Sequence, residues 1–331
     1  LRHFLVQRQI PAIHLLSILT MRSFLIKTIL FLLPVFLVGV CMEALLFGVP
    51  NEYRAKNDAL ARDGKQIHTL VLGSSHTYFG VDPDLMAPGV YNAAFVSQSL
   101  RYDSAILATR LDSLPKLNTV VIPISYFSLF FQLESGQAAA LAKNYRLHLG
   151  IGSAPNPIER LEVVQSRLET SIDKIWMHYL DGGTPPACSP SGWGIPPTKG
   201  APDMAASGRI EAARHIGYVE QGRKHHLSEN VRCLESMLRI CRSRGIRVFL
   251  VTLPATRHYS SLLAPSVWNE IRDTVGRIIA VHPGTTYFDY SDVTGFDDSD
   301  YFDADHLDSS GAAKFTARLA KSLDSATATG R

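Results

Sequence analysis

A serine at the end of a short apolar run is the first residue in this chain with a type and position suited to chemistry. Residues 67–72 are apolar and β-branched, and they end in the turn Gly73-Ser74-Ser75-His76. The hydroxyl of Ser75 becomes a nucleophile if a base removes its proton and backbone N–H groups hold the developing oxyanion. The same Gly-Ser-Ser turn is also typical of a helix N-cap, so the motif alone leaves both interpretations open.

An imidazole and a carboxylate lie close together much later in the chain. Asp303 and His306 are three positions apart, near enough for the carboxylate to accept a hydrogen bond from the ring and fix its tautomer. The other ring nitrogen is then free to act as a base toward the serine. A solvated acidic loop and a calcium site are the alternatives, although Gly295 precedes the carboxylates instead of lying among them. The acidic residues of this loop are Asp292, Asp297, Asp298, Asp300, Asp303 and Asp305.

These loops need a sheet that brings them together, and the hydrophobic pattern predicts one. Apolar β-branched runs alternate with amphipathic runs, which is typical of an α/β fold with a parallel sheet covered on both faces. In such sheets, ligands gather at the carboxyl ends of the strands. Residues 135–228 include a Pro/Gly-rich stretch and are predicted to be an insertion of helices and loops. The predicted strands are 67–72, 89–92, 119–124, 246–252 and 285–290, and the predicted helices are 100–114, 230–244, 266–280 and one that starts near Ser310.

The two motifs together resemble the SGNH (GDSL-like) hydrolase superfamily. The resemblance rests on a strand that ends in Gly-x-Ser, on Asn92 in a second block, and on an Asp-x-x-His-Leu run followed by Gly-Ala. It covers residues 67–323, with the insertion unmatched. It implies a three-layer α/β/α sandwich in which Ser75 is the nucleophile, His306 the base and Asp303 its orienting partner, with Asn92 at the oxyanion or substrate site.

The oxyanion half departs from the family pattern. Ser97 takes the place of the usual glycine, where its backbone N–H can still donate. The third block has no asparagine after its strand, so one donor is missing or is replaced by Ser125 or Tyr126. Losing one such donor typically costs about 10²–10³ in rate. His76, beside the nucleophile, is expected either to contact substrate or to be structural.

An apolar stretch near the amino-terminal end predicts one transmembrane helix. Residues 28–50 are interrupted by Glu43 alone and exceed the roughly 20 residues that cross a bilayer. Mixed charges follow the stretch and basic residues precede it, so the positive-inside rule places residues 1–22 in the cytoplasm and the rest outside. A cleavable signal peptide and a lipoprotein site at Cys41 are the alternatives. The basic residues are Arg2, Arg8, Arg22 and Lys27.

The chain is therefore expected to divide into a membrane helix and an exterior domain. The helix occupies 23–50, a polar helical stalk 51–66, and an SGNH-like domain 67–325. Met21 stands directly before the basic and apolar pattern, so residues 1–20 are interpreted as a misplaced start.

Composition excludes several classes of protein. With 46% hydrophobic and 19% charged residues, most of the chain is not disordered, and 33 basic against 30 acidic residues without clustering do not suit nucleic-acid binding. The four cysteines lack paired spacing, so a metal or redox framework has little support and we expect no cofactor. Cys233 and Cys241 cannot form a disulfide if they share a helix, because eight residues of helix separate them by about 12 Å.

A membrane anchor ahead of Gly-Ser-Ser and a late Asp-x-x-His is a layout similar to the envelope acyl-transfer members of the superfamily, such as the D-alanine transfer protein of teichoic acid systems and the alginate acetylation proteins. The resemblance implies a single-pass inner-membrane protein with an extracytoplasmic esterase or O-acyltransferase domain. Its substrate would be an acylated envelope polysaccharide or a small acyl ester, and its partner a membrane-bound O-acyltransferase. A catalytically silent glycan-binding or scaffold protein is the alternative, because the asparagine is absent.

Overall fold

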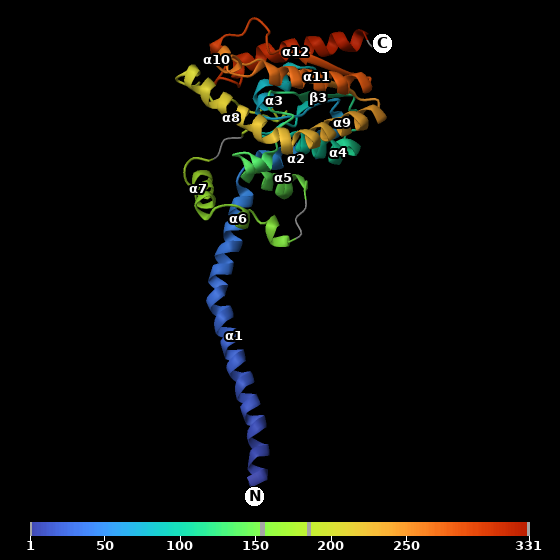
Figure 1. The fold of residues 1–331 in the computed structure, drawn as a ribbon. Helices are drawn as coiled ribbons and strands as arrows, with labels where there is room; N and C mark the ends of the chain where they lie inside the picture. The colour runs from blue at the N-terminus through green and yellow to red at the C-terminus, as the bar shows by residue number, and fades with distance from the viewer. Residues whose placement is uncertain (1, 153–155, 184–186, 330–331) are drawn as a thin grey trace. The chain divides into compact units, whose positions relative to one another are not determined.

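The computed structural model of the protein describes residues 2–152, 156–183 and 187–329. The chain forms two compact units (Figure 1). The sheet unit comprises residues 51–153 and 186–331, and it contains the strands and the candidate site. The helical unit comprises residues 1–50 and 154–185.

A five-stranded parallel β-sheet forms the centre of the sheet unit, with the order β2-β1-β3-β4-β5. Leu70 of β1 lies opposite Tyr91 of β2 on one side and Val120 of β3 on the other. All five residues of β3 are buried, as expected for the central strand of a parallel sheet. The predicted α/β class is therefore confirmed. The strands are β1 (Thr69–Val71), β2 (Val90–Asn92), β3 (Thr119–Pro123), β4 (Arg247–Thr252) and β5 (Thr285–Asp289).

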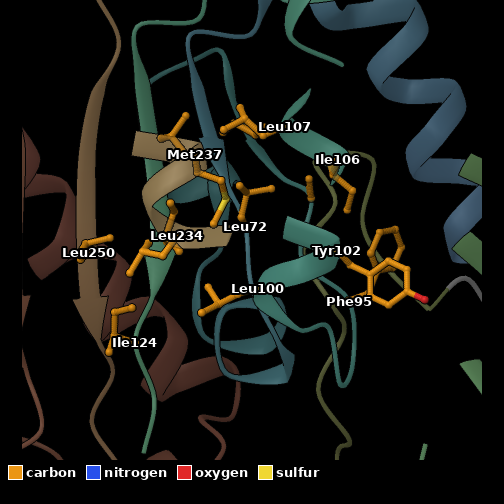
Figure 2. Packing of buried hydrophobic residues seen from close by; sticks show 14 of the residues in the cluster. Leu72, Phe95, Leu100, Tyr102, Ile106, Leu107, Ile124, Leu234, Met237 and Leu250 are labelled. Atoms are coloured by element: carbon orange, nitrogen blue, oxygen red, sulfur yellow. The ribbon is translucent and has the colours of Figure 1, made fainter. Parts of the chain in front are cut away.

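Helices cover both faces of the sheet and produce three layers. On one face, α4, α9 and α11 pack against Leu72, Ile124 and Leu250, in the cluster seen in Figure 2. On the other face, α12 packs against Val121 and Phe249. The helices of this unit are α2 (Glu52–Asp63), α3 (Ser75–Gly80), α4 (Leu100–Arg110), α5 (Ala142–Leu149), α8 (Met204–His225), α9 (Leu227–Ser243), α10 (Arg257–Ser260), α11 (Pro265–Val281) and α12 (Ser309–Thr329).

The amphipathic pattern of α9 shows how sequence places such a helix. Leu234, Met237, Leu238 and Cys241 recur every three or four residues, and all are buried on the face toward the sheet. Gly245 follows the helix with φ 67, a left-handed conformation that suits glycine and ends the helix. Both α9 cysteines are free thiols, in agreement with the sequence argument.

The segment expected to be a polar stalk is instead part of the core of the sheet unit. The ring of Tyr53 in α2 stacks on Phe95 with centroids 4.2 Å apart. The buried ammonium of Lys56 donates to the carbonyl oxygen of Ala94 at 2.5 Å, and burial lowers the pKa of this lysine to about 8. The expectation of a polar stalk was wrong because the buried face of α2 contains a tyrosine and a lysine. The partner of this lysine lies 38 positions away, so no local sequence pattern reveals its burial.

The predicted insertion at 135–228 divides between the two units. Residues 154–185 group with the amino-terminal helix, whereas α5 and α8 stay with the sheet unit. The chain leaves the sheet after β3 and returns at β4, which is the neighbouring strand. The insertion therefore breaks no strand pairing.

The helical unit contains α1 (Arg2–Gly48), α6 (Glu162–Gln165) and α7 (Leu168–Tyr179). Within α1, residues Thr20–Gly48 are long and apolar enough to cross a membrane, and no other helix of the described residues is. A signal sequence near the amino-terminal end has the same character.

The strand order creates a topological switch point at the carboxyl ends of the strands. The chain passes from β1 outward to β2 and then returns to β3 on the other side of β1. The loops after β1 and β3 diverge at this switch point, where open α/β sheets bind ligands. Because all strands are parallel, the loop that follows β5 and leads to His306 also starts at the carboxyl ends of the strands.

Candidate active site

Ser75 is the first residue of α3, directly after the turn that follows β1. Gly73 in this turn has φ +117, and a Cβ there would lie 2.0 Å from the side chain of Pro123, so only glycine fits. Ser74 occupies the N-cap position, yet its side chain makes no capping hydrogen bond. The hydroxyl of Ser75 instead donates to Nε2 of His306 at 2.7 Å. The N-cap interpretation therefore does not account for Ser75.

His306 is held by Asp303 in one orientation. Nδ1 of the ring donates to the Asp303 carboxylate, with both oxygens at 2.9 Å. The same carboxylate accepts the backbone N–H groups of Asp305 at 3.1 Å and His306 at 2.8 Å, so the loop itself fixes its position. Phe302 stacks on the imidazole with an interplanar angle of 8°. The tautomer with a proton on Nδ1 leaves Nε2 free to accept the proton of Ser75.

A second carboxylate, Asp305, also faces the imidazole of His306. Its Oδ1 lies 3.2 Å from Nδ1 of His306, and its Oδ2 accepts from Nε2 of His76 at 3.1 Å. Nδ1 of His76 in turn accepts from the hydroxyl of Ser125 at 2.7 Å. Nδ1 of His215, on α8, lies 3.7 Å from the same Asp305 oxygen. The buried network behind the base is thus larger than a triad.

This network changes the electrostatics of the base. Burial alone would lower the pKa of His306, but the carboxylates of Asp305 and Asp303 outweigh it and raise the pKa to about 10. Burial likewise opposes the charge of Asp305, yet His306 and His76 hold the pKa of that carboxyl well below its usual range. Burial lowers the pKa of His215, so this ring is neutral. The negative charge of Asp305 therefore stabilises a positive charge on His306.

Ser97 lies with Ser75 on the wall of one cavity. Its φ is 58, the only positive value at a non-glycine residue in the described chain. Such a conformation typically costs about 1–2 kcal/mol, and strain of this kind clusters at functional sites. Ser75 starts a helix, so its N–H is among those that the helix leaves unbonded. Ser75 and Ser97 thus bring their backbone N–H groups to the same cavity.

Asn92 and Tyr126, which were considered for this role, lie elsewhere. The amide of Asn92 is fully buried and donates to the carbonyl oxygens of Thr77 and Val81, both at 2.8 Å. It ties β2 to α3 and is not part of the cavity wall. The hydroxyl of Tyr126 accepts from the N–H of Ala264 at 3.3 Å, and its ring packs on Trp268.

Ser125 and His76 contact each other, and neither is part of the cavity wall. The backbone N–H of Ser125 donates to the hydroxyl of Ser128 at 2.8 Å, so Ser125 does not replace the missing asparagine. His76 is bonded at both ring nitrogens and supports the base through Asp305. His76 therefore lies behind the cavity wall, and a contact between His76 and substrate stays a prediction.

Asp305 and His215 are site residues that the sequence does not single out. Asp305 stands among the acidic residues of its loop, although the run Asp-x-Asp-His carries a signal, since both carboxylates lie within three residues of the imidazole. His215 carried none, because it lies on a helix of the insertion and reaches the site through the fold alone.

The cavity beside Ser75 has a volume of about 360 Å³. Its wall combines aromatic side chains with polar ones, among them Arg214, His306 and Ser75. The aromatic residues are Phe79, Phe127, Phe131, Tyr218 and Phe302. An apolar pocket with a few polar groups suits an ester whose acyl part is buried.

Five of the six acidic residues considered for calcium have protein partners in the structure. Asp297 caps a short helical turn by accepting the N–H of Ser299 at 2.9 Å, and Asp300 pairs with Lys314 at 2.6 Å. Nearer the base, the sets His76, Asp305, His306 and Glu211, His215, Asp305 have possible ligand atoms within 4.8 Å of one another. Both ring nitrogens of His76 and of His306, and Nδ1 of His215, are already hydrogen-bonded to protein groups. The donor set therefore fits a proton-transfer network better than a metal site.

The comparisons with known proteins add structural neighbours. No family model and no curated protein matches the chain. Among solved structures, the neighbours are GDSL-like lipases and acylhydrolases. A Streptococcus pneumoniae protein provisionally described as a platelet activating factor shares 9% identity, with a TM-score of 0.42 over 87% of this chain and 99% of that one. A GDSL-like lipase from Bacteroides thetaiotaomicron shares 11%, with a TM-score of 0.39 over 82% and 98%.

A third neighbour is the lipase Lip_vut3 from a goat rumen metagenome, with 12% identity and a TM-score of 0.35 over 77% of this chain and 97% of that one. Identities and TM-scores this low carry no argument about activity. The class defined by the molecule itself is an α/β protein with a parallel sheet and helices on both faces. What it does must be argued from the site.

Proposed function

We propose that the protein is a serine esterase or O-acyltransferase. The observation that carries this proposal is the chain of hydrogen bonds from Ser75 through His306 to Asp303, which ends at an aromatic cavity. Nε2 of His306 takes the proton of Ser75 as Oγ attacks the acyl carbonyl, and the N–H groups of Ser75 and Ser97 receive the oxyanion. The imidazolium then protonates the leaving alkoxide, and water or an acceptor hydroxyl releases the acyl group from Ser75.

We further propose that this domain is held outside the inner membrane by α1 and acts on an acyl group of an envelope polysaccharide. The apolar span Thr20–Gly48 supports the anchor, and the basic residues before it support an extracytoplasmic sheet unit. An anchored esterase of this kind would work beside a membrane-bound O-acyltransferase. The resemblance of the motifs to envelope acyl-transfer proteins supports the glycan substrate and this partner.

A catalytically silent scaffold is the second candidate, and one observation favours it. The hydroxyl and the backbone N–H of Ser125 are both bonded within the protein, so the usual third oxyanion donor is not supplied there. A domain of this kind would bind acylated glycan without turning it over.

A fluorophosphonate probe on the full chain in detergent separates the two candidates. Labelling lost in Ser75→Ala but kept in Ser74→Ala supports the enzyme, since Ser74 differs from Ser75 in making no bond to His306. Release of acetate from acetylated saccharides then tests the glycan substrate. A folded chain with neither labelling nor acetate release supports the scaffold.

A further inference from the structure

The helices α6 and α7 present an apolar surface to solvent. Leu168, Ile172, Trp176 and Leu180 recur every four residues and so form one stripe along α7. This stripe does not face the protein: Trp176 is 60% exposed and Leu180 67%, whereas Ser171 is the buried residue of the helix. Leu161 and Val164, at the start of and within α6, are exposed apolar residues as well. An exposed apolar surface of this extent marks an interaction site.

This apolar surface is fastened to the end of the candidate membrane helix. The carboxylate of Glu43 accepts the backbone N–H groups of Glu162 at 3.0 Å and Val163 at 2.9 Å, which caps the start of α6. The hydroxyl of Tyr179, at the end of α7, donates to the carbonyl oxygen of Leu45 at 3.0 Å. Both helices lie beside the last turns of α1 in the same compact unit (Figure 1). Glu43, the single acid in the apolar run, thus has a structural task.

The length of α1 indicates the depth of this attachment. A hydrocarbon core of about 30 Å is crossed by about 20 helical residues. Counted back from Glu43, such a span begins at Ser23, beside Arg22, and Lys27 one turn further on can extend its ammonium to the interface. Glu43 and Leu45 then lie at the outer boundary of the hydrocarbon. Trp176 and Tyr179 are of the types that gather at that boundary.

We propose that α6 and α7 form an interfacial membrane-binding surface that lies on the outer leaflet, with the stripe of α7 buried in the headgroup and upper acyl region. Lipid is the occupant because the stripe belongs to the same compact unit as the exposed apolar helix α1 and is attached to its end. The inference rests on the proposed membrane anchor and goes beyond it. It assigns this part of the insertion to holding the unit at the bilayer surface instead of to the chemistry.

Trp176 provides the test, because the chain has three tryptophans and α1 has none. The full chain is reconstituted in phosphatidylcholine vesicles that carry brominated acyl chains. We expect clear quenching, stronger with bromines near the headgroups than with bromines near the bilayer centre. The quenched component should be lost in Trp176→Phe and kept in Trp193→Phe, because Trp193 belongs to the sheet unit. Ile172→Glu should weaken it, whereas Ile210→Glu, at a still more exposed position of α8, should not.

Two quenching results would overturn the inference. If acrylamide quenches Trp176 and the brominated lipids do not, Trp176 lies in water. If neither quenches it, Trp176 is covered by protein, either a second copy of the chain or another partner. Extraction of the same vesicles at alkaline pH tests the anchor separately. A chain that stays in the membrane without lipid quenching overturns the surface alone, whereas a chain that is released overturns the anchor as well. Turnover of an aryl acetate in these vesicles tests the esterase proposal independently of the membrane-binding surface and of the anchor.

Discussion

The two halves of the proposed site differ in how far they depart from the SGNH pattern. The proton-transfer half joins Ser75, after β1, to His306 and Asp303, after β5, at distances of 2.7 and 2.9 Å. The proposed oxyanion half draws on the backbone N–H groups of Ser75 and Ser97. Ser97, after β2, stands in place of the usual glycine, and Ser125, after β3, bonds through its hydroxyl to His76 instead. Proton transfer needs particular side chains, whereas an oxyanion is held largely by backbone N–H groups. Sequence can therefore drift further in the second half than in the first.

The largest expected effect comes from breaking the proton-transfer half. Asp303→Asn should keep the fold and lower kcat/KM for an aryl acetate by about 10⁴, because the amide holds the wrong tautomer of His306. Asp292→Asn, an exposed acid of the same loop, is the matched control and should change little. If Asp303→Asn and His306→Ala both leave turnover intact, the activity arises elsewhere and the triad assignment is wrong.

Asp305→Asn should have a smaller effect on rate and a distinct effect on pH dependence. His306 must be neutral to act as a base, so activity falls as pH drops through its pKa, which the two carboxylates raise to about 10. Removing the charge of Asp305 removes one cause of this increase. The acid limb of kcat/KM should therefore move to lower pH by about 1–3 pH units, the usual influence of a close opposite charge. His76 and His215 face the same carboxylate, so circular dichroism should accompany the profile. An unmoved limb in a folded variant would show that Asp305 does not act on the base.

Ser125→Ala tests the oxyanion half. Its hydroxyl bonds to His76 and not to the cavity, so we expect kcat/KM to fall by less than about tenfold, against about 10²–10³ for a true oxyanion donor. A loss in the larger range would mean that Ser125 turns toward the substrate once it binds.

The smallest expected effect is on stability, at Ser97. Glycine adopts φ 58 without the cost that serine carries, although its unfolded state is more flexible. Ser97→Gly should therefore raise the free energy of unfolding by at most about 1 kcal/mol, measured by urea denaturation, and preserve turnover because the N–H remains. A large loss of activity would indicate that the Ser97 side chain contributes to catalysis.

Local sequence patterns were enough to predict the strands, the amphipathic helices and the two site motifs, because each depends on residues close in sequence. The face of α9 and the contact of Asp303 with His306 are of this kind. The contact of His76 with Asp305 spans 229 positions, so its partner could not be inferred from either segment. The aromatic burial of α2 and the grouping of residues 154–185 with α1 were missed for the same reason. The absence of an asparagine after the third strand was visible in the sequence. The hydrogen bond from the Ser125 hydroxyl to His76 was not.

Ser75 and His306 lie 231 positions apart, and this separation has a consequence for the biogenesis of the protein. A chain emerging from the ribosome presents its serine long before the imidazole exists to activate it. The pair therefore forms only when the closing segment, with α12 behind it, docks on the completed sheet. Nascent chains and fragments that end before this segment carry Ser75 without His306.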